Sequence, residues 1–183
     1  MACGEGNFVN DCLERNIDAY GIDIALGNKS NIERLTSSNK LPSKLKERLA
    51  AGDATSLPFK NDSFKAITNQ AGAFSYAHSA QEVIKTLQEQ IRVLSPGGKI
   101  VINPIEITTN SFFPVNFVNA FLDKDKKLTE DKVEEINSAF NEEINKLIDN
   151  NQIRVEVREK ENDMYLKRGI MYGVVIITKT GKE

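Results

Sequence analysis

The chain has 183 residues, of which 40% are hydrophobic and 27% are charged, and its formal net charge is -2. This length and composition predict one soluble globular domain with a substantial core. The small net charge argues against a nucleic-acid partner, and two cysteines with one histidine leave a zinc site almost no ligands, so we expect no metal. No secretory signal is visible and the apolar run Ile170 to Ile177 is too short to span a membrane, so we expect a cytoplasmic protein without membrane partners.

The first residues, Met1-Ala2-Cys3-Gly4-Glu5-Gly6, form a turn of small side chains that opens a helix over Asn7 to Arg15. Small residues let the backbone approach a ligand closely. Such a turn normally follows a buried strand, and the ligand lies over the N-terminus of the next helix. No residue precedes Met1 in this sequence, so we expect the first strand of the sheet to be missing.

Apolar segments and helical patterns alternate in the first two thirds of the chain. The predicted strands are Ala19–Ile24, Leu49–Ala54, Ser63–Asn69 and Lys99–Ile105. The predicted helices after the first are Asn31–Ser37, Ser43–Arg48 and Ala80–Leu94. The last of these helices stops at Ser95-Pro96-Gly97-Gly98, which predicts a turn before the next strand.

The last third of the chain changes character. An aromatic segment, Ser111 to Leu122, precedes a long amphipathic helix over Glu130 to Asn150. Two final strands are predicted over Ile153–Glu159 and Gly169–Lys179. The whole pattern predicts an α/β fold, with a doubly wound, Rossmann-like, mostly parallel sheet, an antiparallel C-terminal strand and no first strand.

Four motifs resemble, in order, those of class I S-adenosylmethionine-dependent methyltransferases: Ala2-Cys3-Gly4-Glu5-Gly6, Gly21-Ile22-Asp23-Ile24, Gly52-Asp53-Ala54 and Arg92-Val93-Leu94-Ser95-Pro96-Gly97-Gly98-Lys99. The resemblance covers Ala2 to about Ile105 and, loosely, the two final strands. It implies a methyltransferase that uses S-adenosylmethionine and acts on a small-molecule acceptor. It also implies one domain, 1–183, with a cofactor-binding half (1–106) and a substrate-covering segment with the final strands (107–183).

The resemblance assigns cofactor contacts to each motif in turn: Ala2, Gly4 and Gly6 for the methionine end, Asp23 for the ribose with Ile24 as a further cofactor contact, Asp53 and Ala54 for adenine, and Asn69 and Gln70 facing the transferred methyl group. The ribose assignment also has a physical basis. A ribose diol offers two donors, and an ionised carboxylate only accepts hydrogen bonds and has room for both. Asp23 lies 17 residues beyond Gly6, close to the roughly 20 seen in dinucleotide-binding folds.

The catalytic group is the least defined part of the predicted site. His78, the only histidine, follows Phe74-Ser75-Tyr76 in a predicted loop and could accept a proton from a hydroxyl acceptor. The alternative is a partly exposed loop histidine with no catalytic role. Neither an N-P-P-Y or D-P-P-Y motif nor a Pro-Cys nucleophile occurs, which argues against methylation of nucleic-acid bases.

A second hypothesis is a non-catalytic, methyltransferase-like binding or interaction protein. It is motivated by the missing strand, by Lys65 where the family pattern has an acid, and by the absence of a persuasive catalytic residue. Without a first strand, the segments Ala19–Ile24 and Phe64–Asn69 expose edges that favour pairing with another chain. We therefore expect a marginally stable chain or a homodimer that pairs through this exposed sheet edge.

Overall fold

The computed structural model of the chain describes residues 3, 4, 6–28, 45, 47–70, 72–108, 111–113, 127–160 and 171–181. The helix predicted at 31–37, half of the one at 43–48 and most of the aromatic segment 111–122 lie outside these residues, as does Ala2. The described helices are α1 (Asn7–Glu14), α4 (Ala80–Val93) and α6 (Glu130–Asp149), with short 3-10 turns η1 (Ile24–Gly27) and η2 (Ala73–Tyr76). The described strands are β1 (Gly21–Asp23), β2 (Leu49–Ala51), β3 (Phe64–Gln70), β4 (Leu94–Thr108), β5 (Ser111–Phe113), β6 (Ile153–Lys160) and β7 (Met171–Lys179).

The long helices begin where their capping residues predict. Ser79 caps α4, because its side chain accepts a hydrogen bond from the Glu82 N–H, which would otherwise lack a partner in the first turn. Thr129 does the same for α6 by accepting from the Lys132 N–H. Two acidic residues in the first turn of α6, Glu130 and Asp131, add a favourable interaction with the helix dipole.

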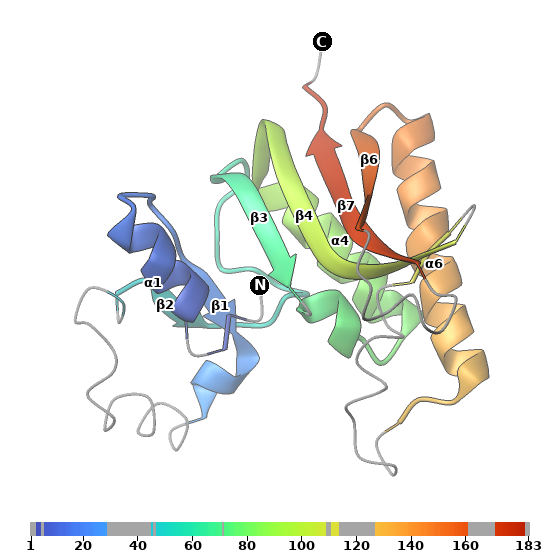
Figure 1. Cartoon of the computed structure of the whole chain (residues 1–183), viewed down its shortest axis with the longest axis horizontal. Helices are drawn as coiled ribbons and strands as arrows, with labels where there is room; N and C mark the ends of the chain where they lie inside the picture. The colour runs from blue at the N-terminus through green and yellow to red at the C-terminus, as the bar shows by residue number, and fades with distance from the viewer. Residues whose placement is uncertain are drawn as a thin grey trace.

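The strands form two sheets (Figure 1). In the small sheet β1 pairs in parallel with β2. The large sheet has the order β3-β4-β7-β6, with β5 paired to β4. The β3–β4 pair is parallel and β7 is antiparallel to both β4 and β6. The predicted α/β Rossmann-like class with an antiparallel C-terminal strand is therefore confirmed.

The small sheet lies on the β3 side of the large sheet, and no strand among the described residues pairs with both β1 and β3 (Figure 1). The rings of Tyr20 and Phe64, at the start of the two strands, meet edge-on with their centroids 6.3 Å apart. The predicted interruption of the sheet is thus found between β1 and β3.

Cys3 occupies one position on the open edge of β1. Gly21 and Asp23 bond towards β2, since the Gly21 N–H donates to the Arg48 carbonyl and the Asp23 carbonyl accepts from the Gly52 N–H. Alternate backbone groups of a strand face opposite edges, so the Ile22 carbonyl faces away from β2. It accepts a hydrogen bond from the Cys3 N–H at 3.1 Å.

One difference from prediction is the segment Ser95-Pro96-Gly97-Gly98, expected as a turn before a strand beginning at Lys99. In the structure β4 already begins at Leu94, which pairs with Phe64, and the next aligned pair is Ala66 with Lys99. The extra residues of β4 form a bulge, which Gly97 accommodates with a left-handed φ of 75°. The glycines therefore shape an irregular strand rather than a separate turn.

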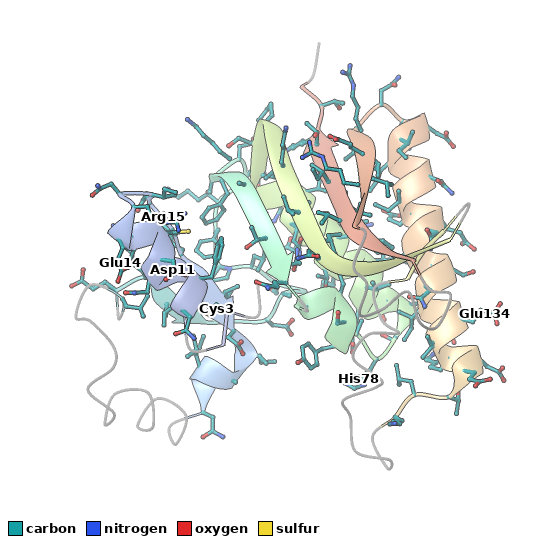
Figure 2. The ribbon with its side chains drawn as sticks, in the orientation of Figure 1. Cys3, Asp11, Glu14, Arg15, His78 and Glu134 are labelled. Carbon is teal, nitrogen blue, oxygen red and sulfur yellow. The ribbon has the colours of Figure 1, made fainter. Side chains whose placement is uncertain are left out.

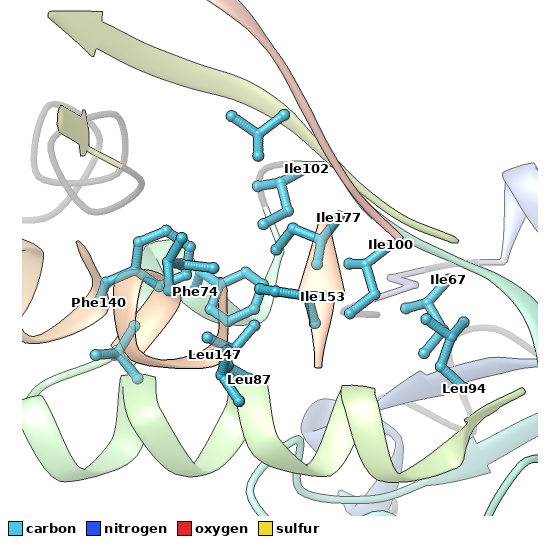
Figure 3. Close-up of a cluster of buried hydrophobic side chains, with 14 of the residues drawn as sticks. Ile67, Phe74, Leu87, Leu94, Ile100, Ile102, Phe140, Leu147, Ile153 and Ile177 are labelled. Carbon is cyan, nitrogen blue, oxygen red and sulfur yellow. The ribbon is translucent and has the colours of Figure 1, made fainter. Parts of the chain in front are cut away.

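The core lies between the large sheet and the helices α4 and α6, as the close-up of buried side chains shows (Figure 3). Leu87 of α4, Phe140 of α6 and Ile100 and Ile177 of the sheet are completely buried. The Phe140 ring packs edge-on against Phe74 of η2 at a centroid distance of 5.3 Å. Among the described residues, no helix combines the length and the apolar character needed to cross a bilayer.

Candidate functional site

Most of the predicted cofactor residues that the structure describes lie where β1 and β2 end, whereas Asn69 and Gln70 lie at the end of β3. Because β1 and β2 are parallel, their carboxyl ends share one edge, where such folds bind ligands. Asp23 is the last residue of β1, and Asp53 follows β2 by two positions. The glycine turn and the N-terminus of α1 lie beside them, because Gly4 is hydrogen-bonded to Asp23.

The glycine turn needs its glycines. Gly6 is the N-cap of α1 with φ 79°, a left-handed conformation that side chains disfavour. A Cβ atom at Gly6 would also lie 2.9 Å from the Leu49 side chain. Gly4 likewise has a positive φ, 52°, but a Cβ atom there would meet nothing within 4 Å. The turn is thus packed against β2 at Gly6 and open at Gly4.

Asp23 connects the glycine turn to the end of β1. Its Oδ2 accepts the Gly4 N–H at 2.8 Å, and its Oδ1 accepts the Ala25 N–H at 2.9 Å. Each carboxylate oxygen keeps capacity for another donor, so two ribose hydroxyls can still be accepted. Ile24, the next residue, is 73% exposed. An exposed aliphatic side chain beside a carboxylate gives this edge one apolar and one charged contact surface.

Asp53 is held in a tight turn by its neighbours. Its Oδ1 accepts both the N–H and the hydroxyl of Thr55 at 2.8 Å, and its backbone carbonyl accepts the Ser56 N–H. No donor among the described residues bonds to its Oδ2. Asp53 is exposed and Ala54 is half-buried, so the free carboxylate oxygen is available to a ligand amino group.

Asn69 and Gln70 at the end of β3 lie in different environments. The Asn69 side chain is 1% exposed and forms a reciprocal amide pair with Gln90 of α4, at 2.7 and 3.3 Å. This pair commits the Asn69 side chain to the core, so only its backbone can face a ligand. Gln70 is exposed at the end of the strand. The role of both residues towards the methyl group stays a prediction.

His78 lies beyond the end of β3, apart from Cys3 in the glycine turn (Figure 2). It is exposed, and its backbone N–H donates to Glu82 at 2.7 Å. No described residue hydrogen-bonds to its imidazole ring. Tyr76, two residues earlier, is 54% exposed. The His78 ring is therefore exposed and has no hydrogen-bond partner among the described residues, and its catalytic role stays a prediction.

Cys3 lies in the candidate site, but its thiol is expected to be unreactive. Burial disfavours its thiolate, and the negative charge of Asp23 disfavours it further, so the pKa of the Cys3 thiol rises from 9.0 to about 11. The group is a neutral thiol at physiological pH and a poor nucleophile. Within the described part of the chain, no three metal-binding side chains come together.

Sequence reasoning missed three residues that hold the site or its neighbouring segment: Gln90, Glu89 and Arg92. Gln90, which binds Asn69, lies 21 positions away, so no local pattern reveals the pair. Glu89 and Arg92 hold the segment that follows Asp53, through contacts such as the hydrogen bond from the Leu57 N–H to Glu89. Their spacing of three residues on a predicted helix is a signal for an ion pair but not for its target.

Comparison with known proteins agrees with this geometry. The family model described as "Methyltransferase domain" matches residues 1–102. A demethylmenaquinone methyltransferase of Renibacterium salmoninarum is 31% identical over 102 residues, covering 56% of this chain and 38% of that protein. The chain spans less than half the length of the first curated relatives it matches, at 22%, 38% and 45%.

Solved structures share the fold at low sequence identity. A crystal structure described as SAM-dependent methyltransferases from Methanosarcina mazei has a TM-score of 0.55 and 20% identity, covering 100% of this chain and 91% of that one. The 1,6-didemethyltoxoflavin-N1-methyltransferase of Burkholderia thailandensis, solved with S-adenosylhomocysteine, has a TM-score of 0.56 and 16% identity, covering 98% and 69%. Because the family model covers more than half of the sequence, the predicted family is confirmed: this chain belongs to the methyltransferase-domain family.

Proposed function

We propose that this chain binds S-adenosylmethionine and belongs to an enzyme that transfers the methyl group to a small-molecule acceptor. The observation that carries the proposal is Asp23, a carboxylate at the end of β1 that is hydrogen-bonded to the glycine turn at Gly4. This arrangement puts an acceptor for a ribose diol next to a turn that a ligand can approach closely. S-adenosylmethionine has a ribose with a neighbouring charged chain and so matches both parts.

The residues present fit the cofactor along its length. The open side of Gly4 would face the methionine end, and Asp23 would accept the ribose hydroxyls. The exposed Ile24 side chain would pack against the adenine ring, whose amino group would donate to the free Oδ2 of Asp53. When bound, the cofactor supplies an electrophilic sulfonium methyl group. The protein then has mainly to align the acceptor, a task that needs no strong base.

The acceptor is proposed from chemistry that the relatives share. The first curated relatives are named demethylmenaquinone methyltransferases, so an aromatic, quinone-type acceptor is the finer form of the proposal. The aromatic residues of segment 111–122 suit such a ring in composition. His78 would take the proton of an acceptor hydroxyl.

Calorimetric titration with S-adenosylhomocysteine tests the binding step directly. We expect saturable heat and a rise in melting temperature, because a ligand that binds only the folded state stabilises it. The absence of both binding heat and a thermal shift would refute the proposal. Transfer of radiolabelled methyl to a demethylated quinol then tests the acceptor class.

The second candidate, a non-catalytic binding protein, is supported by the exposed His78 ring, to which no residue in the described part of the chain hydrogen-bonds. It predicts cofactor binding with no methyl transfer to any acceptor tested. Loss of transfer in a His78→Ala variant that still binds S-adenosylhomocysteine would reject this candidate in favour of the enzyme. Dimerisation and cytoplasmic location remain predictions in either case.

A further inference from the structure

We propose that Arg92 and Glu89 are positioning residues that hold the adenine loop, residues 52–61, and thereby set the affinity for the cofactor. This inference rests on the proposed function, because it concerns how the Asp53 turn is held for its ligand. Both residues lie in the last turns of α4 and belong to no part of the site that touches the ligand. Their side chains bind the loop at three of its residues, beyond Asp53.

Arg92 makes the larger set of contacts. Its Nη1 donates to the Phe59 carbonyl at 2.8 Å and to the Asn61 side chain at 2.9 Å. Its Nη2 donates to the Leu57 carbonyl at 3.0 Å. The guanidinium group is planar and presents several donors in a fixed arrangement, so one side chain fixes three acceptors relative to each other.

Glu89 orients Arg92 and binds the loop itself. Its two oxygens accept hydrogen bonds from Nε and Nη2 of Arg92, each at 2.7 Å, and form a bidentate ion pair. Its Oε2 also accepts the Leu57 N–H at 2.8 Å. The Glu89 side chain is only 19% exposed. The hydrogen bond from Arg92 keeps the pKa of Glu89 below its usual value, so the pair stays charged at neutral pH.

The held part of the loop is closely connected to Asp53. Leu57, which both side chains bind, is 6% exposed and packs in the main core. Only three residues separate it from Asp53, and the hydrogen bond from the Ser56 N–H to the Asp53 carbonyl closes the turn between them. The Gly52 N–H donates to the Asp23 carbonyl at 3.3 Å, so the loop also lies next to Asp23, the proposed acceptor of the ribose hydroxyls. A shift of Leu57 therefore moves the turn that presents Asp53.

The contacts of the Arg92 side chain with the loop are separate from the contacts that hold the start of β3. Backbone contacts at the end of the loop do not depend on the Arg92 side chain, since the Asp62 N–H donates to the Arg92 carbonyl. Lys179 also holds Asp62, at 2.7 Å. Removing the guanidinium group should thus release residues 54–61 while the start of β3 stays in place.

The test compares Arg92→Ala, Arg92→Lys and Glu89→Gln with Arg158→Ala as the control. Arg158 forms an exposed ion pair with Glu156 on β6 and contacts no part of the loop. Hydrogen–deuterium exchange without ligand measures the protection of residues 54–61, and calorimetry measures the affinity for S-adenosylhomocysteine. Melting curves establish that each variant is folded at the temperature of measurement.

We expect Arg92→Ala to raise exchange in the loop and to weaken the affinity by about tenfold or more, whereas Arg158→Ala changes neither. Arg92→Lys keeps the positive charge but not the planar guanidinium group, so its loss of affinity should be smaller than that of Arg92→Ala. If Arg92→Ala fails to fold, Arg92→Lys can be measured in its place. In methyl-transfer assays the KM for S-adenosylmethionine should rise with kcat nearly unchanged.

Two results would overturn the inference. One is unchanged loop protection in a folded Arg92 variant, which would show that other contacts hold the loop. The other is increased exchange with unchanged affinity, which would show that the loop is held for stability alone. Failure of the parent chain to bind S-adenosylhomocysteine would instead refute the proposed function, and the exchange measurement would still decide whether Arg92 holds the loop.

Discussion

The large sheet with α4 and α6 differs sharply from the small region of α1, β1 and β2. The large sheet has strands of up to 15 residues and a core with fully buried side chains such as Ile100 and Phe140. In the small region both strands have three residues, and several large apolar side chains are exposed: Phe8, Ile17, Tyr20 and Ile24. Yet Gly4, Gly6, Asp23 and Asp53 all lie in or next to the small region. The proposed binding groups thus lie in the part of the fold with the shorter strands, where local opening is expected to cost least.

The largest expected effect concerns the open edges of β1 and β3, the edges with which no strand in the described ranges pairs. Each unpaired buried backbone group costs about 1–3 kcal/mol, and several together rival the 5–15 kcal/mol or so that stabilises a typical domain. We therefore expect residues 1–183 to be marginally stable or dimeric. An apolar, strand-forming segment fused ahead of Met1 should raise the melting temperature, since Cys3 already bonds to the open edge of β1. Light scattering and thermal denaturation measure both properties.

A fused Gly-Ser segment of the same length is the control, because it adds chain without strand propensity. A monomeric 1–183 chain that melts cooperatively at ordinary temperatures and binds cofactor tightly would show that the open edges cost little.

The second prediction compares the same truncation in the two regions. Ile100→Ala in β4 should destabilise the protein by about 3–5 kcal/mol, and Ile22→Ala in β1 by about 2 kcal/mol or less. Both side chains are buried, at 0% and 4% exposure. The difference is expected because the small region can open while the large sheet stays folded. Denaturant titrations measure both losses, and equal losses would show that the two regions unfold as one unit.

The third prediction concerns Asp23, the proposed acceptor of the ribose hydroxyls. Asp23→Ala should weaken binding of S-adenosylhomocysteine by about 1.5–3 kcal/mol, roughly 10- to 150-fold, because hydrogen bonds to a charged group are lost. The substitution also removes the hydrogen bond that the Gly4 N–H donates to the Asp23 carboxylate. Asp11→Ala on the exposed side of α1 is the matched control (Figure 2) and should change the affinity little. Equal affinities for the two variants in calorimetry would remove Asp23 from the site.

The smallest expected effect is the pH dependence that Cys3 contributes. Its pKa in the folded protein is about 11, above the ordinary 9.0, so the unfolded chain releases the proton first as the pH rises. Stability should therefore fall between about pH 9 and pH 11. Unfolding free energies across this range measure the slope. Cys3→Ser should reduce the slope of the unfolding free energy against pH, whereas Cys12→Ser should leave this slope unchanged. An unchanged slope in Cys3→Ser would assign the effect to other groups.

The sequence by itself determined the elements with strong local patterns. The helix predicted at Ala80–Leu94 is α4, Ala80–Val93, and the one at Glu130–Asn150 is α6, Glu130–Asp149. Their apolar periodicity and capping residues are local, so they can be read from neighbouring residues. The acids Asp23 and Asp53 were placed at strand ends for the same reason.

Only the tertiary structure decided which side chains meet. The acceptors of Arg92 in the loop lie 31 to 35 residues away, and Asn69 turns into the core because Gln90 of α4 lies opposite it. The Pro96-Gly97 segment became a bulge because β3 continues to pair with β4 on both sides of it. Local periodicity specifies which face of an element is apolar, but not which distant donor or acceptor will be packed against it. That choice is made when helices and strands from distant parts of the chain assemble around one core.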